Sequence, residues 1–490
     1  MVTIAFAAVR VAYWATGGGF STTALANSWQ LLDLDQLVAH PFQSVTLLHI
    51  QPPLFNLFVG GVLRWSPLPH ALTFQLAYLA CGLVMVLALR ALLIELGFTP
   101  GAATAGAVAI ACDPALLSYE NAVTYEVPVA TLLVVSSLLC ARYVRTRRRA
   151  PLAGFLAATT LIVLTRALLH PVWLALCVVV ILACARPQFS RRRVIAMVAV
   201  PLVIVGGWAL KNQILFDEPS LSSWLGMNLA RGVIAPMPRH DTDALIRAGK
   251  LTPAARVPAF SPYSAYAPTV GPCRTHWTEP VVRSLTKRNG ESNFNAVCYL
   301  RVYQDAQHNA LTAIEERPGA YLRGRGASTA AHFMFELGPG LEPFRENSVL
   351  RGLKDLYDVP MLAVHMTIND RDWTNPLIPG APPPSIPMSL TLLFATALVL
   401  ARAVLAAYRL ARRRQHICDL TWLYLGFTVA FVTAVSIATE YGENSRFRFL
   451  TDPIVIGVLV ASVARVVTAP FAVRARDDVD PNHASTTKTT

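Results

Sequence analysis

The sequence is poor in charged residues. Only 14% of its 490 residues are Asp, Glu, Lys or Arg, against about 25% in an ordinary soluble domain. It lacks a P-loop, a GxGxxG motif, an HExxH pair and a CxxC pair, which are the usual signatures of nucleotide and zinc chemistry. It also shows no internal repeat. Apolar residues make up 54% of the chain and are therefore the main guide to its fold class.

Most of the apolar residues fall into blocks of about 18–25 residues, the length that a helix needs to cross a bilayer. Because lipid cannot satisfy backbone polar groups, several such blocks predict an all-α polytopic membrane protein. Eleven blocks are candidates for spanning helices: residues 4–20, 52–65, 71–95, 101–118, 122–143, 150–168, 171–186, 193–210, 387–410, 419–439 and 449–468.

Basic clusters lie between these blocks and account for much of the formal net charge of +13. The clearest are Arg145–Arg149, Arg191–Arg193 and Arg412–Arg414. An excess of Arg in short loops is typical of the cytoplasmic side of a membrane protein. No basic stretch is interleaved with aromatic residues, so we expect no nucleic-acid partner.

Fixing these clusters on the inside orients the chain. The short block 52–65 follows Pro52 and ends at Arg64 and Trp65, which are typical interfacial anchors. We therefore expect it to lie along the outer surface, so that residues 21–70 form one outer loop and ten helices span. The first block has the length of a signal peptide, but it lacks a basic start and a clear cleavage site, so we expect a first membrane helix. This helix is short, which suggests that the natural start lies further upstream.

This topology predicts four parts. They are an N-terminal transmembrane bundle (1–210), an extracytoplasmic loop domain (211–386), C-terminal transmembrane helices (387–470) and a disordered cytoplasmic tail (471–490). Within the loop domain, the patterns predict helices over residues 295–317 and 319–338 and a Pro-rich loop over residues 251–275.

Cys273 and Cys298 are the two cysteines of the loop domain. An oxidising compartment would allow them to form a disulfide, which we favour slightly over two free thiols. The other cysteines lie in or beside apolar blocks and show no metal-type spacing, so we expect them to be small buried residues.

The first outer loop holds two carboxylates, Asp33 and Asp35, in a largely apolar segment close to the membrane. A carboxylate that enters the membrane costs free energy unless it has a partner or a task. Helix capping or a solvated interfacial charge is the simpler alternative for either residue alone. Further along the loop, Gln51-Pro52-Pro53-Leu54 opens the short block.

This arrangement resembles the GT-C glycosyltransferases that use polyprenyl-phosphate-linked sugars, such as the protein O-mannosyltransferases and the aminoarabinose transferases. In these relatives a His-Pro-Pro-Leu or Lys-Pro-Pro-Leu element opens a juxtamembrane helix, where this chain has Gln51, with His49 two residues before it. The resemblance implies an acidic catalytic residue in the first outer loop. Asp33 is then the first candidate for the general base and Asp35 the second.

A second part of the resemblance lies in the last outer loop. Arg446-Phe447-Arg448 precedes Asp452-Pro453 and is similar to the ERYR-x-P ending of many GT-C proteins. The fork of donors on a guanidinium suits a phosphate, so Arg446 and Arg448 are candidates for binding the donor phosphate, with His49, Arg166 and Gln51 behind them. The alternative is a lipid-headgroup anchor, or an ion pair with Glu440 or Glu443.

Glu120 and Glu126 lie near a short outer turn between two helices. GT-C enzymes often carry a second acidic residue in such a place, so the resemblance implies that these glutamates orient the acceptor or bind a divalent cation, Mg²⁺ or Mn²⁺. No cofactor is required by the sequence itself. A structural Glu–Arg pair with Arg166 inside the bundle is an equal alternative.

Together these features predict a multi-pass cell-membrane glycosyltransferase of the cell envelope. It would transfer a sugar from a polyprenyl phosphate to a glycan, lipid or protein acceptor on the outer face, and the loop 211–386 would select the acceptor. One alternative is a transporter or flippase of a lipid-linked or envelope precursor, although transporters commonly show repeats that are absent here. The other is a non-catalytic envelope scaffold.

Overall fold

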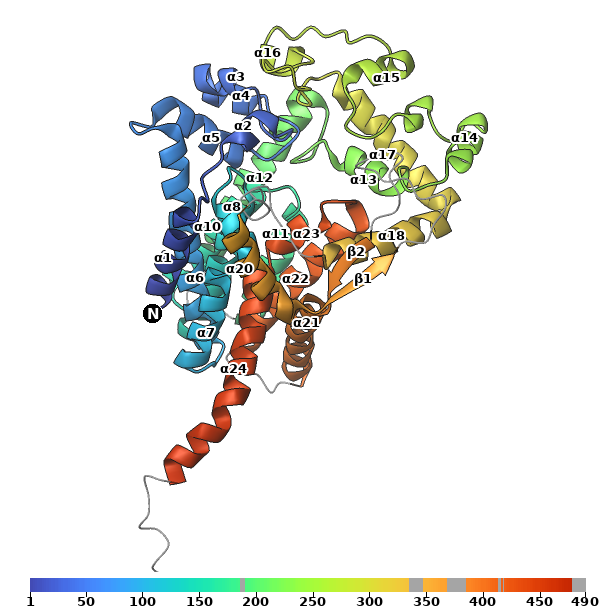
Figure 1. Ribbon diagram of the computed structural model, residues 1–490. Coiled ribbons are helices and arrows are strands. Elements are labelled where there is room, and N and C mark those ends of the chain that lie inside the picture. The colour runs from blue at the N-terminus through green and yellow to red at the C-terminus, as the bar shows by residue number, and fades with distance from the viewer. Residues whose placement is uncertain (186–189, 335–346, 368–384, 413–415, 417, 478–490) are drawn as a thin grey trace, which may run out of the picture.

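The computed structural model describes residues 1–185, 190–334, 347–367, 385–412, 416 and 418–477. Within these residues the chain is almost wholly helical (Figure 1). Two strands, β1 (Ala363–Thr367) and β2 (Ser385–Ser389), form an antiparallel pair in which Ala363 lies opposite Ser389. The architecture agrees with the predicted all-α class.

Within the described part of the chain, five helices are long and apolar enough to cross a membrane. They coincide with five of the predicted blocks, because each block carries more than four turns of apolar residues without a charge cluster. The helices are α6 (His70–Glu95), α9 (Glu126–Thr146), α12 (Arg191–Phe216), α21 (Leu390–Ala411) and α22 (Asp419–Thr439).

The remaining predicted spans are also helical: α1, α10 and α11 have 14, 17 and 15 residues, α7 and α8 form a bent pair, and α24 runs unbroken over 26 residues. A sixth span results if α7 and α8, which meet at an angle of 56°, count as one. The number of ten spans stays a prediction. The helices concerned are α1 (Val2–Ala15), α7 (Pro100–Ala111), α8 (Pro114–Glu120), α10 (Arg149–Thr165), α11 (Pro171–Ala185) and α24 (Asp452–Asp477).

Residues 21–70, here called the first loop, contain four short helices. These are α2 (Thr23–Asn27), α3 (Leu34–Ala39), α4 (Pro41–Thr46) and α5 (Pro53–Trp65). The expected non-spanning block is α5, which has 13 residues and begins at the Pro-Pro pair. Proline favours the first turn of a helix because its missing N–H would be unsatisfied there.

Residues 211–386 are here called the large loop, and the described residues among them are mainly helical. The helices with described bounds are α13 (Leu225–Val233), α14 (Arg239–Arg247), η1 (Pro253–Arg256), α15 (Tyr263–Val270), α16 (Pro280–Arg283), α17 (Tyr299–Glu316), α18 (Pro318–His332), α20 (Ser348–Asp358) and η2 (Val359–Met361). The two predicted helices correspond to α17 and α18. The prediction of plain loop over residues 251–275 is wrong in part, because η1 and α15 lie there.

The predicted tail also starts later than expected, because α24 continues to Asp477. Residues 478–490 lie outside the described part of the chain. Figure 1 shows α24 leaving the bundle at the end opposite the large loop.

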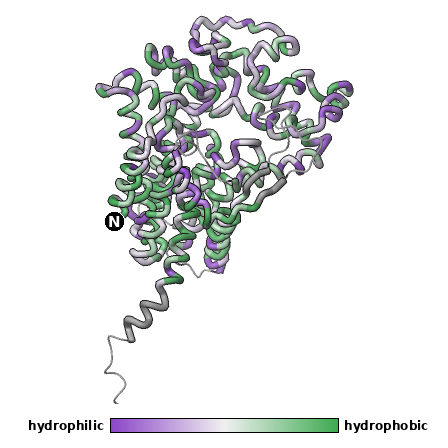
Figure 2. The backbone as a smooth tube through the Cα atoms, viewed as in Figure 1, coloured by the Kyte–Doolittle hydropathy of each residue, from purple (hydrophilic) through white to green (hydrophobic). Residues whose placement is uncertain are grey.

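Both loops pack onto the same end of the bundle (Figure 1). One hydrophobic core joins Leu31 of the first loop, Phe294 and Tyr299 of the large loop, and Trp173 and Tyr424 of the membrane helices. Hydrophobic residues dominate the bundle, whereas the loop end is mixed in hydropathy (Figure 2). The shared core fixes the two loops against each other and against the helix ends between them.

Candidate functional site

A cavity of about 610 Å³ lies where the two loops meet the helix ends. Its walls come from residues 27–30 and Gln51 of the first loop, from residues 166–172 after α10, from residues 218–231 of the large loop, and from residues 431–447. The last segment includes the short helix α23 (Asn444–Phe449). Binding sites in proteins are commonly concave and formed between such units.

Two arginines on one wall share a buried glutamate. Arg446 Nε donates to Glu126 Oε1 at 2.6 Å, and Arg166 Nη1 lies 3.5 Å from the same oxygen. Glu126 is fully buried at the start of α9, whereas Arg446 is 24% exposed and lines the cavity. The structure therefore brings three of the predicted residues together and realises the Glu–Arg alternative for Glu126.

Arg166 is the least satisfied member of this cluster. Its guanidinium carbon lies 4.1 Å from the centre of the Tyr125 ring and 4.4 Å from that of Phe447. Its side chain is 7% exposed, its Nε is buried without a hydrogen-bond partner, and it lines the cavity. A buried guanidinium held between two rings with spare donors is suited to an anion.

Two further carboxylates line this end of the cavity. Glu440 is 3% exposed and its Oε1 lies 3.4 Å from Arg231 Nη1, while Arg446 Nη1 donates to Glu443 Oε2 at 3.2 Å. Burial raises the pKa of Glu440 despite the nearby Arg231. Burial alone would also raise the pKa of Glu443, but Arg446, Arg231 and Arg166 outweigh it and the net shift is downward. The two carboxyl groups thus differ in proton affinity.

The other predicted phosphate ligands lie in different places. Gln51 lines the cavity. His49 lies behind the wall, fully buried, and its two ring nitrogens are 2.9 Å from Ser223 Oγ and from the Asn295 carbonyl oxygen. Burial lowers the pKa of His49 to about 3. A neutral imidazole in this position joins the two loops.

Arg448 points away from the cavity that Arg446 lines. Its Nε donates to Asp452 Oδ1 at 2.9 Å, and its Nη1 donates to the His332 and Met334 carbonyl oxygens at 2.5 and 2.6 Å. It is 2% exposed. All of these partners are internal, so the geometry gives Arg448 a role in holding α24 to the end of α18.

Asp33 and Asp35 lie outside the cavity, on an exposed contact between the two loops. Asp33 caps α3 by accepting from the Asp35 amide at 2.9 Å, and its other oxygen accepts from the Arg288 amide at 2.6 Å. Arg288 Nη1 donates to Asp35 Oδ2 at 2.6 Å. This is the capping and ion-pairing alternative of the sequence analysis, and neither carboxylate is among the described cavity residues.

Glu120 pairs with Arg10 of α1, at 2.7 Å between Oε2 and Nη2, and both residues are buried. The contact is close-packed, because a Cβ atom at Gly82 would lie 1.6 Å from Glu120 Oε1. Arg10 also donates to the Ala111 carbonyl at the break between α7 and α8. The Arg10–Glu120 pair thus neutralises two buried charges, and Arg10 supplies a hydrogen bond to the backbone where the span is broken.

The donor set does not fit the divalent cation that the resemblance implied. Glu120 and Glu126 each face an arginine. Within the described residues, no three His, Cys, Asp or Glu side chains come together as metal ligands would.

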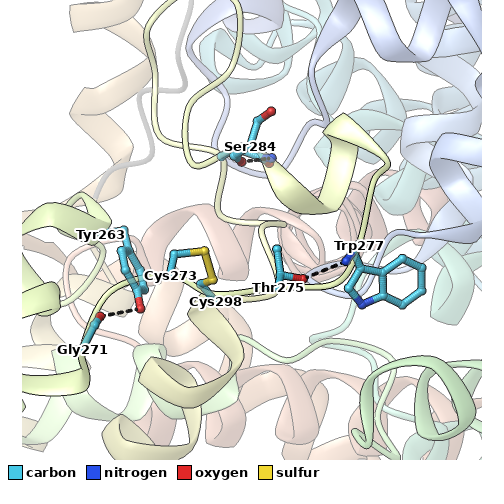
Figure 3. The surroundings of a disulfide bond; sticks show 8 residues. Tyr263, Gly271, Cys273, Thr275, Trp277, Ser284 and Cys298 are labelled. Carbon is cyan, nitrogen blue, oxygen red and sulfur yellow. Dashed lines mark hydrogen bonds between the residues drawn. A yellow bond between two sulfur atoms is a disulfide. The ribbon is translucent and has the colours of Figure 1, made fainter.

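The disulfide candidates are bonded in the structure. Cys273 and Cys298 are joined with their Cα atoms 5.4 Å apart, and the bond ties the segment after α15 to the start of α17 (Figure 3). Beside it, Tyr263 donates through its hydroxyl to the Gly271 carbonyl at 3.0 Å. Neither cysteine is among the described cavity residues, so the disulfide stabilises the large loop itself rather than the cavity wall.

Sequence reasoning missed Arg231 as a cavity residue and named Glu440 and Glu443 only as possible partners of the arginines. Arg231 lies in the amphipathic helix α13, and nothing in its local sequence distinguishes it from a solvated arginine. The available signal was the spacing of Glu440, Glu443 and Arg446, which places all three within seven residues directly after one membrane helix.

No family model and no curated protein matches the sequence. Two solved structures of the Archaeoglobus fulgidus oligosaccharyltransferase are similar. The apo form has 14% identity and a TM-score of 0.37 over 97% of this chain and 51% of that chain. The form tethered to an acceptor peptide containing the NVT sequon has 13% identity and a TM-score of 0.30 over 93% and 46%. This chain spans about half the length of that protein, and similarity at this level assigns neither family nor activity to it.

Proposed function

We propose that this protein is a membrane glycosyltransferase that moves a sugar from a polyprenyl-phosphate donor to an acceptor hydroxyl or amine at the outer face of the membrane. The observation that carries the proposal is the pair Arg166 and Arg446 on the cavity wall, one of them with unused donors. The resemblance of the first and last outer loops to GT-C enzymes agrees with it. The lipid tail would lie against the apolar helices below.

In this reaction the bond between the anomeric carbon and the phosphate oxygen breaks while the acceptor oxygen or nitrogen bonds to the same carbon. Negative charge grows on the departing polyprenyl phosphate. Fixed guanidinium groups stabilise that charge with little reorganisation when water is excluded. Arg166 is suited to this role because Tyr125 and Phe447 hold its plane and, among the described residues, its Nε has no hydrogen-bond partner.

The acceptor proton needs a base. We favour Glu440, because it lines the cavity beside Arg231 and burial raises its pKa toward the operating range of a general base. Asp33 remains the prediction from the sequence, with Asp35 behind it. The two assignments differ in place, since Asp33 binds the Arg288 amide on the exposed side of the loops.

The test uses the full-length protein in nanodiscs with a panel of polyprenyl-phosphate sugars and candidate acceptors, following release of polyprenyl phosphate. We expect sugar-dependent release that Glu440→Gln lowers by at least about 100-fold. Asp33→Asn is the matched comparison and should retain most of the activity. Loss of release with Asp33→Asn and not with Glu440→Gln would return the base to the first loop.

The rival classes predict other outcomes. A transporter or flippase would move the intact donor across proteoliposomes without releasing polyprenyl phosphate. A scaffold would do neither, and Arg166→Gln would then leave every readout unchanged. Proteoliposomes that hold the same wild-type protein and donor panel separate the three classes.

A further inference from the structure

The end of the cavity away from the arginines has a distinct chemistry. Five carboxamide side chains line the cavity, and within the described chain none of them makes a side-chain hydrogen bond; they are Asn27, Gln30, Gln51, Asn228 and Gln307. The Oε1 atom of Gln30 is buried without a partner. A carboxamide both donates and accepts, as a hydroxyl does. Gln30, Gln51 and Asn228 are partly buried, and Asn27 and Gln307 are exposed, so these amides are open to a ligand that replaces their water.

Aromatic rings stand beside these amides. The Trp29 side chain is 42% exposed, although its ring stacks on Phe260 at 5.5 Å between centres. Trp224 packs edge-on against Phe260 at 5.1 Å, and its Nε1 donates to Tyr303 Oη at 3.1 Å. All three rings line the cavity and are held in place. An immobilised ring beside unpaired amides fits a ligand with an apolar face and hydroxyl edges.

Helix α13 runs between the tryptophan end and the arginine end of the cavity. Trp224 precedes its first residue, and Asn228 and Arg231 follow at helical spacing on the same side, all three lining the cavity. Seven residues at 1.5 Å each separate the ends by about 10 Å. That length accommodates one sugar ring next to a phosphate bound at the arginines.

The charged side chains on the cavity wall also favour one class of sugar. Among the described lining residues, every arginine belongs to the end where Arg166, Arg231 and Arg446 pair with glutamates. The remaining carboxylate on the wall is Glu218, which forms no ion pair with any residue that the structure describes. A carboxylate accepts hydrogen bonds from hydroxyl groups and repels an anionic sugar.

We infer that Trp29, Trp224 and the unpaired carboxamides form a sugar subsite that takes a neutral, hydroxyl-rich ring and rejects an acidic one. The inference rests on the proposed function, because it assigns the arginine end to the donor phosphate. The sugar lies with its apolar face on the tryptophan end, and its hydroxyl groups exchange hydrogen bonds with Asn228, Gln307 and Gln51.

The experiment measures binding to the full-length protein in nanodiscs with two kinds of probe. The first kind is polyprenyl phosphate alone, and the same lipid carrying mannose, glucose, arabinose or glucuronic acid. The second is soluble methyl mannoside and methyl glucuronide, detected by saturation-transfer NMR. We expect a neutral sugar to tighten lipid binding by at least about tenfold over polyprenyl phosphate, the gain from a few hydrogen bonds and one ring contact, and glucuronic acid to give no gain.

The variants are Trp29→Ala and Gln307→Ala, with Trp29→Phe and Gln304→Ala as matched controls. Gln304 is an exposed amide on the same helix α17 and is not among the described cavity residues. Trp29→Ala should abolish the gain from the sugar, and Gln307→Ala should reduce it by about fivefold. Both should leave the affinity for polyprenyl phosphate unchanged, and both controls should behave as wild type.

Equal affinity with and without a neutral sugar, or tighter binding of glucuronic acid, would overturn the inference while leaving the proposed function standing. If polyprenyl phosphate does not bind but methyl mannoside does so in a Trp29-dependent manner, the subsite holds and the proposed function fails. If no neutral sugar binds in either form, the subsite is refuted.

Discussion

Two groups of carboxylates face arginines at the loop end of this protein, and they differ in burial. In the cavity group, Glu126 and Glu440 are 0% and 3% exposed. In the loop group, the Asp35 side chain is 50% exposed and its partner Arg288 is 83% exposed. Water screens the second group and leaves its ion pair worth about 0–1 kcal/mol. In the first, removal from water alters proton affinity and leaves donors unused, and these are the properties that a reaction requires.

The largest effect should come from removing a cavity arginine. We expect Arg166→Gln to lower the rate of polyprenyl phosphate release by about 100-fold or more, because one preorganised donor to the departing phosphate is lost. Arg288→Gln on the exposed contact should change the rate by less than about twofold. Equal rates for the two variants would erase the distinction between the groups. Thermal unfolding in detergent controls for misfolding.

The second-largest effect is expected in stability, at a buried histidine that carries no charge. His49→Ala should lower the free energy of unfolding by about 2–4 kcal/mol, since it removes the imidazole partner of the Ser223 hydroxyl and of the Asn295 carbonyl and opens a void between the loops. His40→Ala, at an exposed histidine of the same loop, is the control and should have little effect. An equal loss in both variants would contradict a buried joint at His49.

The same residue predicts a pH dependence. The ordinary pKa of histidine is 6.5, and burial lowers that of His49 to about 3. Between these values the unfolded chain binds a proton that the folded chain does not. Stability conferred by neutral His49 is therefore complete above pH 6.5 and is lost progressively as the pH falls toward 3. Unfolding curves should show this slope in the wild type, and a weaker slope in His49→Gln.

A smaller effect is expected in the rate as the pH falls. If Glu440 is the base, the rate must decline at acidic pH with a midpoint above 4.5, the ordinary value for glutamate, because burial raises the pKa of Glu440. The decline should be about tenfold per pH unit well below the midpoint. Arg231→Gln should move the midpoint higher, since the pairing cation is gone. An unchanged midpoint in that variant would exclude Glu440.

The smallest effect belongs to the exposed group. Asp35→Asn should cost less than about 1 kcal/mol of stability, and its effect should fade in high salt, as for other solvated ion pairs. Asp33→Asn keeps an oxygen that can still cap α3 but loses the acceptor for the Arg288 amide, so its effect should be about 1 kcal/mol. A loss of several kcal/mol, or of activity, would place the exposed carboxylates with the cavity group.

Much of this architecture could be predicted from the order of apolar and charged residues along the chain. Long apolar blocks must become helices in lipid, and the positions of α6, α9, α12, α21 and α22 follow from that requirement. The non-spanning helix α5 also followed from local signals, namely its length, the Pro-Pro start and its interfacial end. These properties depend on residues close together in the chain.

The site could be predicted only in part. Arg446, Arg166 and Gln51 were named from the sequence and do line the cavity, but Arg448, two residues from Arg446, does not. On α23, two residues of helix turn a side chain by about 200°, so one arginine meets the cavity and the other meets Asp452. Which of the two faces inward depends on how α23 packs against α9 and α18.

Sequence by itself determined that this chain forms a helical membrane protein, where its helices lie, and that carboxylates and arginines gather at its loop end. Only the tertiary structure decided which carboxylates are buried. Residues 33 and 440 are far apart in the chain and equally acidic. Their difference arises because α13 and α18 of the large loop pack over Glu440 at the end of α22, whereas Asp33 lies on the partly exposed contact between the loops. Desolvation depends on neighbours that the chain brings together only when it folds.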